Sequence, residues 1–120
     1  MRPETYYSIG TNLTDGASNT LFIVPAGYEA RVSMVYISNN TGSSKSFSAS
    51  WWHDGTEICF AASKNLGSND FIQYGGQFGD FLILDEEDYM TITPEAESTF
   101  VSIVSFILLK HDGTKFDLTI

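Results

Sequence analysis

Residues 99–109 read TFVSIVSFILL, and this stretch decides the fold class. Successive side chains of an extended strand point to opposite faces, and here both faces are apolar. One face carries Val101, Ile103, Ile107 and Leu109, and the other carries Phe100, Val104, Phe106 and Leu108. Burying each such side chain is worth about 1.5–3 kcal/mol. We therefore expect the core to cover one face, and a loop such as 64–80 or a neighbouring subunit to cover the other.

Strand-forming residues cluster in short runs along the rest of the chain, and helix signals are almost absent. The expected strands span residues 4–9, 20–24, 29–38, 45–53, 56–63, 69–74, 80–84, 88–93, 99–109 and 115–120. This pattern, with its turn signals every eight to twelve residues, predicts an all-β fold, an antiparallel β-sandwich or barrel with about eight to ten short strands. We expect residues 1–120 to form a single domain, with 1–19 and 110–120 as terminal strands or arms that contact neighbours.

Two of these runs show which side chains should share a face. In 45–53, Phe47, Ala49 and Trp51 alternate with serines and face the core, so Trp52 points outward. The run 29–38 is apolar on both sides. Val32, Met34 and Tyr36 form one expected set, and Val35 and Ile37 form the other.

Charge and cysteine content exclude several classes of protein. Six Lys and Arg against fifteen Asp and Glu give a net charge of −9, which disfavours nucleic acid and anionic membrane surfaces as partners. The N-terminus lacks the apolar core of a secretory signal, and no stretch is long enough to span a membrane. The single cysteine, Cys59, cannot form an intrachain disulfide, and its apolar surroundings predict a buried thiol.

The tetrapeptide HDGT occurs at 53–56 and again at 111–114, and these two copies contain both histidines. Asp-Gly between two strands is typical of a type I′ hairpin turn, in which both central residues need a positive φ. A catalytic reading would need a nucleophile beside the His-Asp pair, and a metal reading would need further ligands. Both copies are therefore predicted to be turns, and a cupin-type metalloenzyme is disfavoured by the two histidines.

The acidic run at 84–92, LDEEDYMTI, holds Asp85, Glu86, Glu87 and Asp88 side by side. Carboxylates suit calcium, but this run lacks the spacing of a calcium-binding loop. A solvated turn is the favoured interpretation over a weak Ca²⁺ site at Asp85–Asp88, and no cofactor is expected.

The segment 20–52 resembles a pattern of small structural proteins from tailed bacteriophages. That pattern runs Tyr/Phe-x-Val-Pro-Ala-Gly, an alternating strand ending in Ser-Asn-x-Thr/Ser-Gly, and a second alternating strand. It is matched by Phe22, Val24, Pro25, Ala26, Gly27, Ser38, Asn39, Thr41, Gly42 and Phe47 to Trp51. The run 84–92 resembles a later Leu-x-x-Gly-Asp-x-Ile/Leu-x-Val element, with Glu87 in place of glycine. We expect a tighter or differently shaped turn there.

The resemblance, which covers roughly residues 20–109, implies an antiparallel β-sandwich that is jelly-roll-like, and a non-enzymatic protein of the virion. It implies a capsid decoration (cement) protein that stabilises the particle through subunit contacts, with a neck or tail component as the alternative. The expected partners are other copies of the chain and other virion proteins, namely major capsid or neck and tail proteins. A different alternative is a carbohydrate-binding, lectin-like receptor-recognition module, in which Trp52, Tyr74 and the 85–88 loop would contact a sugar.

Doubly apolar strands and exposed aromatic residues give a candidate interface for assembly. Its predicted residues are Val35, Ile37, Trp52, Phe71, Tyr74, Phe100, Val104, Phe106 and Leu108. No catalytic or metal-binding residue is predicted.

Overall fold

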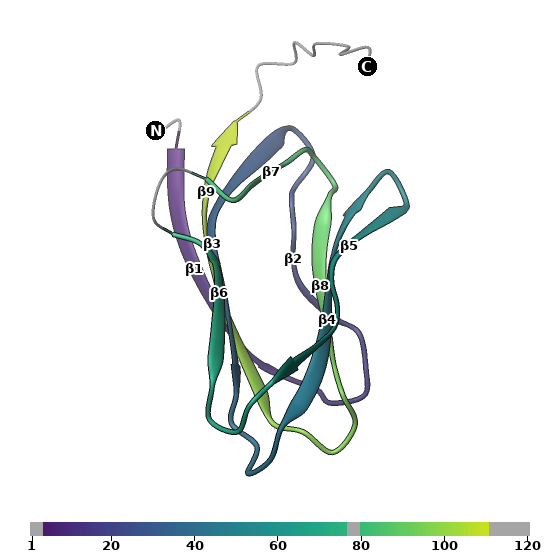
Figure 1. Cartoon of the computed structure of the whole chain (residues 1–120). Helices are drawn as coiled ribbons and strands as arrows, with labels where there is room; N and C mark the ends of the chain where they lie inside the picture. The colour runs from purple at the N-terminus through teal and green to yellow at the C-terminus, as the bar shows by residue number, and fades with distance from the viewer. Residues whose placement is uncertain (1–3, 77–79, 111–120) are drawn as a thin grey trace.

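Two facing antiparallel sheets make up the computed structural model, which describes residues 4–76 and 80–110 (Figure 1). The strands are β1 (Glu4–Leu13), β2 (Asn19–Ile23), β3 (Tyr28–Asn39), β4 (Lys45–His53), β5 (Thr56–Leu66), β6 (Phe71–Gly75), β7 (Leu82–Leu84), β8 (Tyr89–Pro94) and β9 (Phe100–Lys110). Sheet A has the order β1-β9-β3-β6, with β7 also paired to β3, and sheet B has the order β2-β8-β4-β5. Within the described ranges, no helix has the length and apolar character needed to cross a membrane.

The connectivity is that of a jelly roll. The chain forms nested antiparallel pairs, with β1 against β9, β2 against β8, β3 against β6 and β7, and β4 against β5. This long hairpin is rolled so that β9 also pairs with β3 and β8 also pairs with β4. The predicted jelly-roll sandwich is therefore confirmed.

The predicted strands fall close to the observed ones. The largest difference among the described strands lies in β1, which continues to Leu13 where the sequence indicated an end at residue 9. Its whole length pairs with β9, from Glu4 opposite Leu109 to Leu13 opposite Phe100. The predicted strand at 115–120 lies outside the described residues, and both edges of β9 are already occupied by β1 and β3.

The core lies between the two sheets and decides which face of each strand points inward. Phe47 on sheet B meets Phe100 on sheet A, with ring centroids 6.0 Å apart. Phe100, Val104 and Phe106 of β9 are buried in this core. The other β9 face, which carries Ile103 and Ile107, therefore points away from sheet B.

A β-bulge in β3 changes one predicted face. The register with β9 shifts between Val32 and Met34, so strict alternation fails there. Val32 is completely buried together with Val35 and Ile37, whereas Met34 and Tyr36 are only partly buried. The prediction that Val32 shares a face with Met34 and Tyr36 is wrong, because the extra residue of the bulge reverses the alternation.

Cys59 is exposed, which corrects the prediction of a buried thiol. It lies on β5, the edge strand of sheet B, opposite Ser50 of β4. Figure 1 shows the end of the β4–β5 hairpin projecting away from the rest of the sandwich. An apolar run on such an edge has fewer neighbours to bury it than the same run in a central strand.

Candidate assembly surface

The outer face of sheet A is apolar along most of its width. We call this surface face A; it is formed by the side chains of sheet A that point away from sheet B. Four of its residues are large hydrophobic side chains exposed to solvent, namely Tyr6, Phe71, Ile83 and Ile103. Ile83 is 57% exposed, Phe71 55% and Ile103 40%. The expected second apolar face of β9 thus exists, and in the structure it is partly open to solvent.

The strand register arranges face A in rows that cross the sheet. One row contains Tyr6, Ile107, Arg31 and Ile83, from β1 through β9 and β3 to β7. Another row contains Ile103 beside Tyr36, whose ring stacks on Phe71 at a centroid distance of 5.2 Å. Both rows raise large side chains above the sheet.

Between these two rows, a row of small side chains on β1 and β9 and in the bulge of β3 forms a groove, and Met34 of β3 lies at the end of this row, opposite Ser105. Ser8 and Ser105 are opposite each other, and their hydroxyls are 2.9 Å apart. The Ser33 hydroxyl, in the bulge of β3, donates to the Ser105 carbonyl at 3.1 Å. These serines and the flanking Tyr6 and Ile107 line a cavity of about 430 Å³. The groove is open, bounded by apolar side chains and floored by hydroxyls that already have hydrogen-bond partners within the sheet.

Face A is electrically almost neutral on a strongly acidic chain. Among side chains described on its strands, the outward charged residues are Glu29 and Arg31, which lie 3.5 Å apart as an ion pair. The chain as a whole carries a net charge of −9. The described side chains of face A thus add no net charge to it, and another acidic molecule could approach this part of the surface with little repulsion.

The outer face of sheet B differs in kind. Its strands present serine and threonine side chains and Glu57, to which Ser50 donates at 2.7 Å, and a single apolar row of Ile23, Tyr89 and Trp52 crosses β2, β8 and β4. Ile23 in this row is 61% exposed. Trp52 points outward as predicted and lies flat beside Tyr89, with ring centroids 5.7 Å apart and an interplanar angle of 9°. Its indole N–H donates to the Thr91 hydroxyl at 3.0 Å. Trp52 is thus held against its own sheet by neighbouring strands.

The predicted interface residues divide between the core and the surface. Val35, Ile37, Phe100, Val104 and Phe106 are buried between the sheets and are not available to a partner. Their selection as interface residues is wrong. The sequence shows that these strands have two apolar faces but does not show which face points into the core. Their neighbours Ile103 and Ile107, with Met34, Tyr36 and Ile83 from adjacent strands, occupy face A instead.

The other predicted interface residues lie in three different places. Phe71 lies on face A, and Leu108 packs against the core. Tyr74 packs inward against Phe60 and Phe81, at centroid distances of 5.4 and 5.6 Å. Trp52 lies on the outer face of sheet B, so Trp52 and Tyr74 do not share a surface on which a sugar could stack.

The first HDGT copy is a two-residue hairpin turn, as predicted. Its two central residues, Asp54 and Gly55, have φ values of 49° and 77°, and His53 is opposite Thr56. Positive φ at both central positions is the signature of a type I′ turn. The second copy, at 111–114, lies outside the described residues.

His53 has a further role that its turn position did not indicate. Its Nδ1 lies 2.9 and 3.1 Å from the two carboxylate oxygens of Asp88, and its Nε2 lies 3.5 Å from Asp54. The hydrogen bond to Asp88 is the largest cause of the raised pKa of His53, and partial burial opposes it. The described polar partners of this imidazole are carboxylates, so it is not positioned beside a nucleophile.

Asp88 is the buried anchor of the acidic turn. It is 1% exposed and also accepts hydrogen bonds from the Trp51 indole, at 3.1 Å, and the Asp85 backbone N–H, at 3.0 Å. The interpretation of 85–88 as a wholly solvated turn is therefore wrong for this residue. In the described parts of the chain, no three His, Cys, Asp or Glu side chains converge as a metal site would require. The signal for Asp88 was in the phage pattern, whose Gly-Asp places an aspartate at this position.

Glu87 occupies the position at which the phage pattern has glycine. Its φ is 67°, in the left-handed region that glycine adopts without strain. Its backbone N–H donates to the Val24 carbonyl at 2.8 Å, and Val24 N–H donates to the Asp88 carbonyl at 2.9 Å. The turn geometry thus suits glycine, although a glutamate is present.

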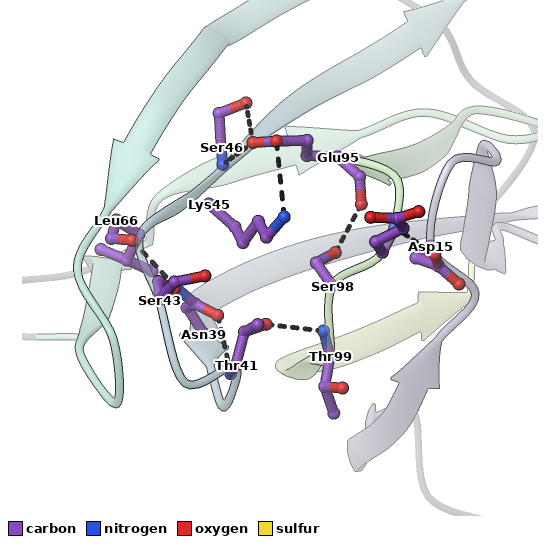
Figure 2. Close-up of polar contacts among 11 residues, drawn as sticks. Asp15, Asn39, Thr41, Ser43, Lys45, Ser46, Leu66, Glu95, Ser98 and Thr99 are labelled. Carbon is purple, nitrogen blue, oxygen red and sulfur yellow. Dashed lines mark hydrogen bonds and ion pairs between the residues drawn. The ribbon is translucent and has the colours of Figure 1, made fainter.

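The opposite end of the sandwich is closed by a network of polar contacts, shown in Figure 2. Asn39, fully buried at the end of β3, donates from Nδ2 to the carbonyls of Ser43 and Leu66 and accepts from the Thr41 N–H. The Thr41 hydroxyl accepts from Thr99 N–H at 2.8 Å. These contacts tie the loop after β3 to the ends of β5 and β9.

A second part of the network joins the neighbouring loops. Glu95 accepts from Ser46 N–H at 2.9 Å and lies 3.8 Å from the Lys45 ammonium. The bond from Ser46 is the main cause of the lowered pKa of Glu95. Glu97 N–H donates to Asp15 at 2.6 Å. The side chains at this end are engaged in bracing loops, which is a structural role.

Comparisons with known proteins identify the fold and no family. No protein-family model matches the chain, and no curated protein matches it. Among solved structures, a chain from Bacillus endospore appendages, which are disulfide-linked pili, is 11% identical; the match covers 91% of this chain and 88% of that one, with a TM-score of 0.55. A chain from infectious bursal disease virus strain Gx is 13% identical, with a TM-score of 0.44 over 92% of this chain and 33% of that one. At such identities, the similarity to the pilus chain shows the fold alone.

Proposed function

We propose that this chain is a non-enzymatic structural subunit of a bacteriophage virion, a capsid decoration protein that stabilises the particle through subunit contacts. Face A is the observation that carries the proposal. Exposed apolar patches of this kind mark surfaces that bind other proteins, because leaving Ile83, Ile103 and Phe71 in water forgoes the free energy of their burial.

Two further observations support the proposal. The segment 20–52 resembles phage structural proteins, and its strands lie in the sandwich with Val24, Phe47 and Ala49 in the core. The described titratable groups form structural contacts, such as those of Asp88 and Glu95, and they do not form a nucleophile–base pair. A neck or tail position in the virion would use the same surface.

Particle binding tests the proposed function. Purified chain is mixed with phage capsids that lack their decoration protein, and bound protein is measured by sedimentation and located by electron microscopy. We expect saturable binding at symmetry-related positions and capsids that resist heat better. Binding to isolated necks or tails would move the protein to that part of the virion. Absence of binding to every particle fraction would refute the virion role.

A further inference from the structure

We propose that face A packs against the same face of a second copy of this chain, forming a two-fold symmetric pair. This inference rests on the proposed function, since it names the first partner that the assembly surface would bind. In this pair, the exposed apolar side chains of sheet A contact the same surface of the second copy.

The size of face A suits such a pair. Four strands lie abreast in sheet A, and β9 is eleven residues long. With strands about 4.8 Å apart and about 3.4 Å per residue, the face measures roughly 700 Å². Stable protein pairs bury about 800 Å² per partner. Standard-size interfaces span about 600–1,000 Å² per partner, so face A is large enough to hold two copies together.

Charge favours a second copy. With a net charge of −9, two copies repel each other over most of their surfaces. On face A the described charges are Glu29 and Arg31, which neutralise each other at 3.5 Å. Contact between two such faces therefore brings together a surface of each copy whose described charges cancel, and it adds little electrostatic repulsion.

The relief of face A is self-complementary. Rows of large side chains that contain Ile107 and Ile83 on one side and Ile103 and Tyr36 on the other border a groove floored by Ser8 and Ser105. A two-fold interface brings the same patch of both subunits together, so every contact between one residue of the first copy and another residue of the second copy occurs twice. A row from each copy then enters the groove of the other. The outer face of sheet B carries one described row of apolar side chains, formed by Ile23, Tyr89 and Trp52, and lacks the pair of rows that borders the groove of face A.

The mass of the full-length chain in solution tests this pairing. Light scattering and native mass spectrometry are applied to the wild type and to Ile103→Lys and Ile83→Lys. Both isoleucines are partly exposed and lie on different strands, so one variant remains informative if the other fails to fold. The matched control is Thr93→Lys, an exposed position on sheet B that receives the same added charge. Circular dichroism confirms that each variant is folded.

We expect the wild type and Thr93→Lys to have twice the 13.3 kDa mass of one chain. Each isoleucine variant should raise the dimer dissociation constant by roughly 30-fold or more, as for a central interface residue.

Separate outcomes distinguish this inference from the proposed function. A wild type that is monomeric at tens of micromolar but binds particles overturns the pairing and leaves the virion role intact. A dimer unaffected by both isoleucine variants also overturns the pairing. A dimer that dissociates as expected but binds no particle supports the pairing and refutes the virion role.

Discussion

Replacing Glu87 with glycine is expected to stabilise the protein. Glu87 has a φ of 67°, and this left-handed conformation costs an L-residue other than glycine roughly 1–2 kcal/mol. Glycine is also more flexible in the unfolded chain, which offsets about 0.5–1 kcal/mol of that gain. The Glu87 side chain is exposed, and the backbone bond to Val24 does not depend on it. The net expectation is a gain of about 0.5–1 kcal/mol.

The assay is urea unfolding followed by tryptophan fluorescence, because Trp51 lies beside the turn through its bond to Asp88. Glu87→Ala is the matched control, since it removes the same negative charge and keeps the left-handed strain. We expect Glu87→Gly to have a higher free energy of unfolding in urea than both the wild type and Glu87→Ala. In thermal unfolding, its melting temperature should be higher by roughly 2–4 °C. If the alanine variant equals or exceeds the glycine variant, strain at this residue is not what limits stability, and the reasoning fails.

Three other substitutions probe the polar interior. Asn39→Asp keeps the shape of a fully buried side chain but replaces the amide donors, which bond to backbone carbonyls, with an acceptor. Urea unfolding should show a free energy of unfolding lower by about 3 kcal/mol. An unchanged urea midpoint would contradict the network. Ser102→Ala removes a buried hydroxyl that has no hydrogen-bond partner among the described residues, and calorimetry should show a melting temperature equal to or above that of the wild type. His53 has a pKa raised above its ordinary value of 6.5, mainly by the bond to Asp88. The contribution of His53 to stability is therefore complete below pH 6.5 and is lost as the pH rises through the pKa of the folded state. His53→Gln should remove that pH dependence from urea midpoints between pH 5.5 and 8, and an identical slope in both proteins would exclude His53 as its source.

Much of the fold could be predicted from local sequence patterns. Short alternating runs such as 45–53, separated by turn residues, fixed where strands begin and end, and Asp54-Gly55 identified its hairpin. These features depend on a residue and its nearest neighbours along the chain. For the same reason the pattern could not show that β9 lies between β1 and β3, which depends on distant pairing.

The candidate surface and the buried anchor Asp88 were harder to predict, because the contacts that determine them are not local. The bulge at Ser33 has no glycine or proline to mark it, yet it moves Val32 into the core. The sequence of β9 does not show which of its two apolar faces points inward. That depends on sheet B, where Phe47 packs against Phe100. Asp88 resembles its acidic neighbours in sequence, and only the fold brings it to the indole of Trp51.

The position of β9 has a consequence for how the protein is made. A ribosome synthesises β1 and β3 long before β9, and sheet A cannot close until this strand is inserted between them. Contacts that join residues about a hundred positions apart, such as Glu4 with Leu109, are slow to form. The nascent chain therefore exposes unpaired strand edges throughout translation, the condition under which chains associate wrongly. Fragments that stop before residue 100 should be captured by chaperones and should not fold.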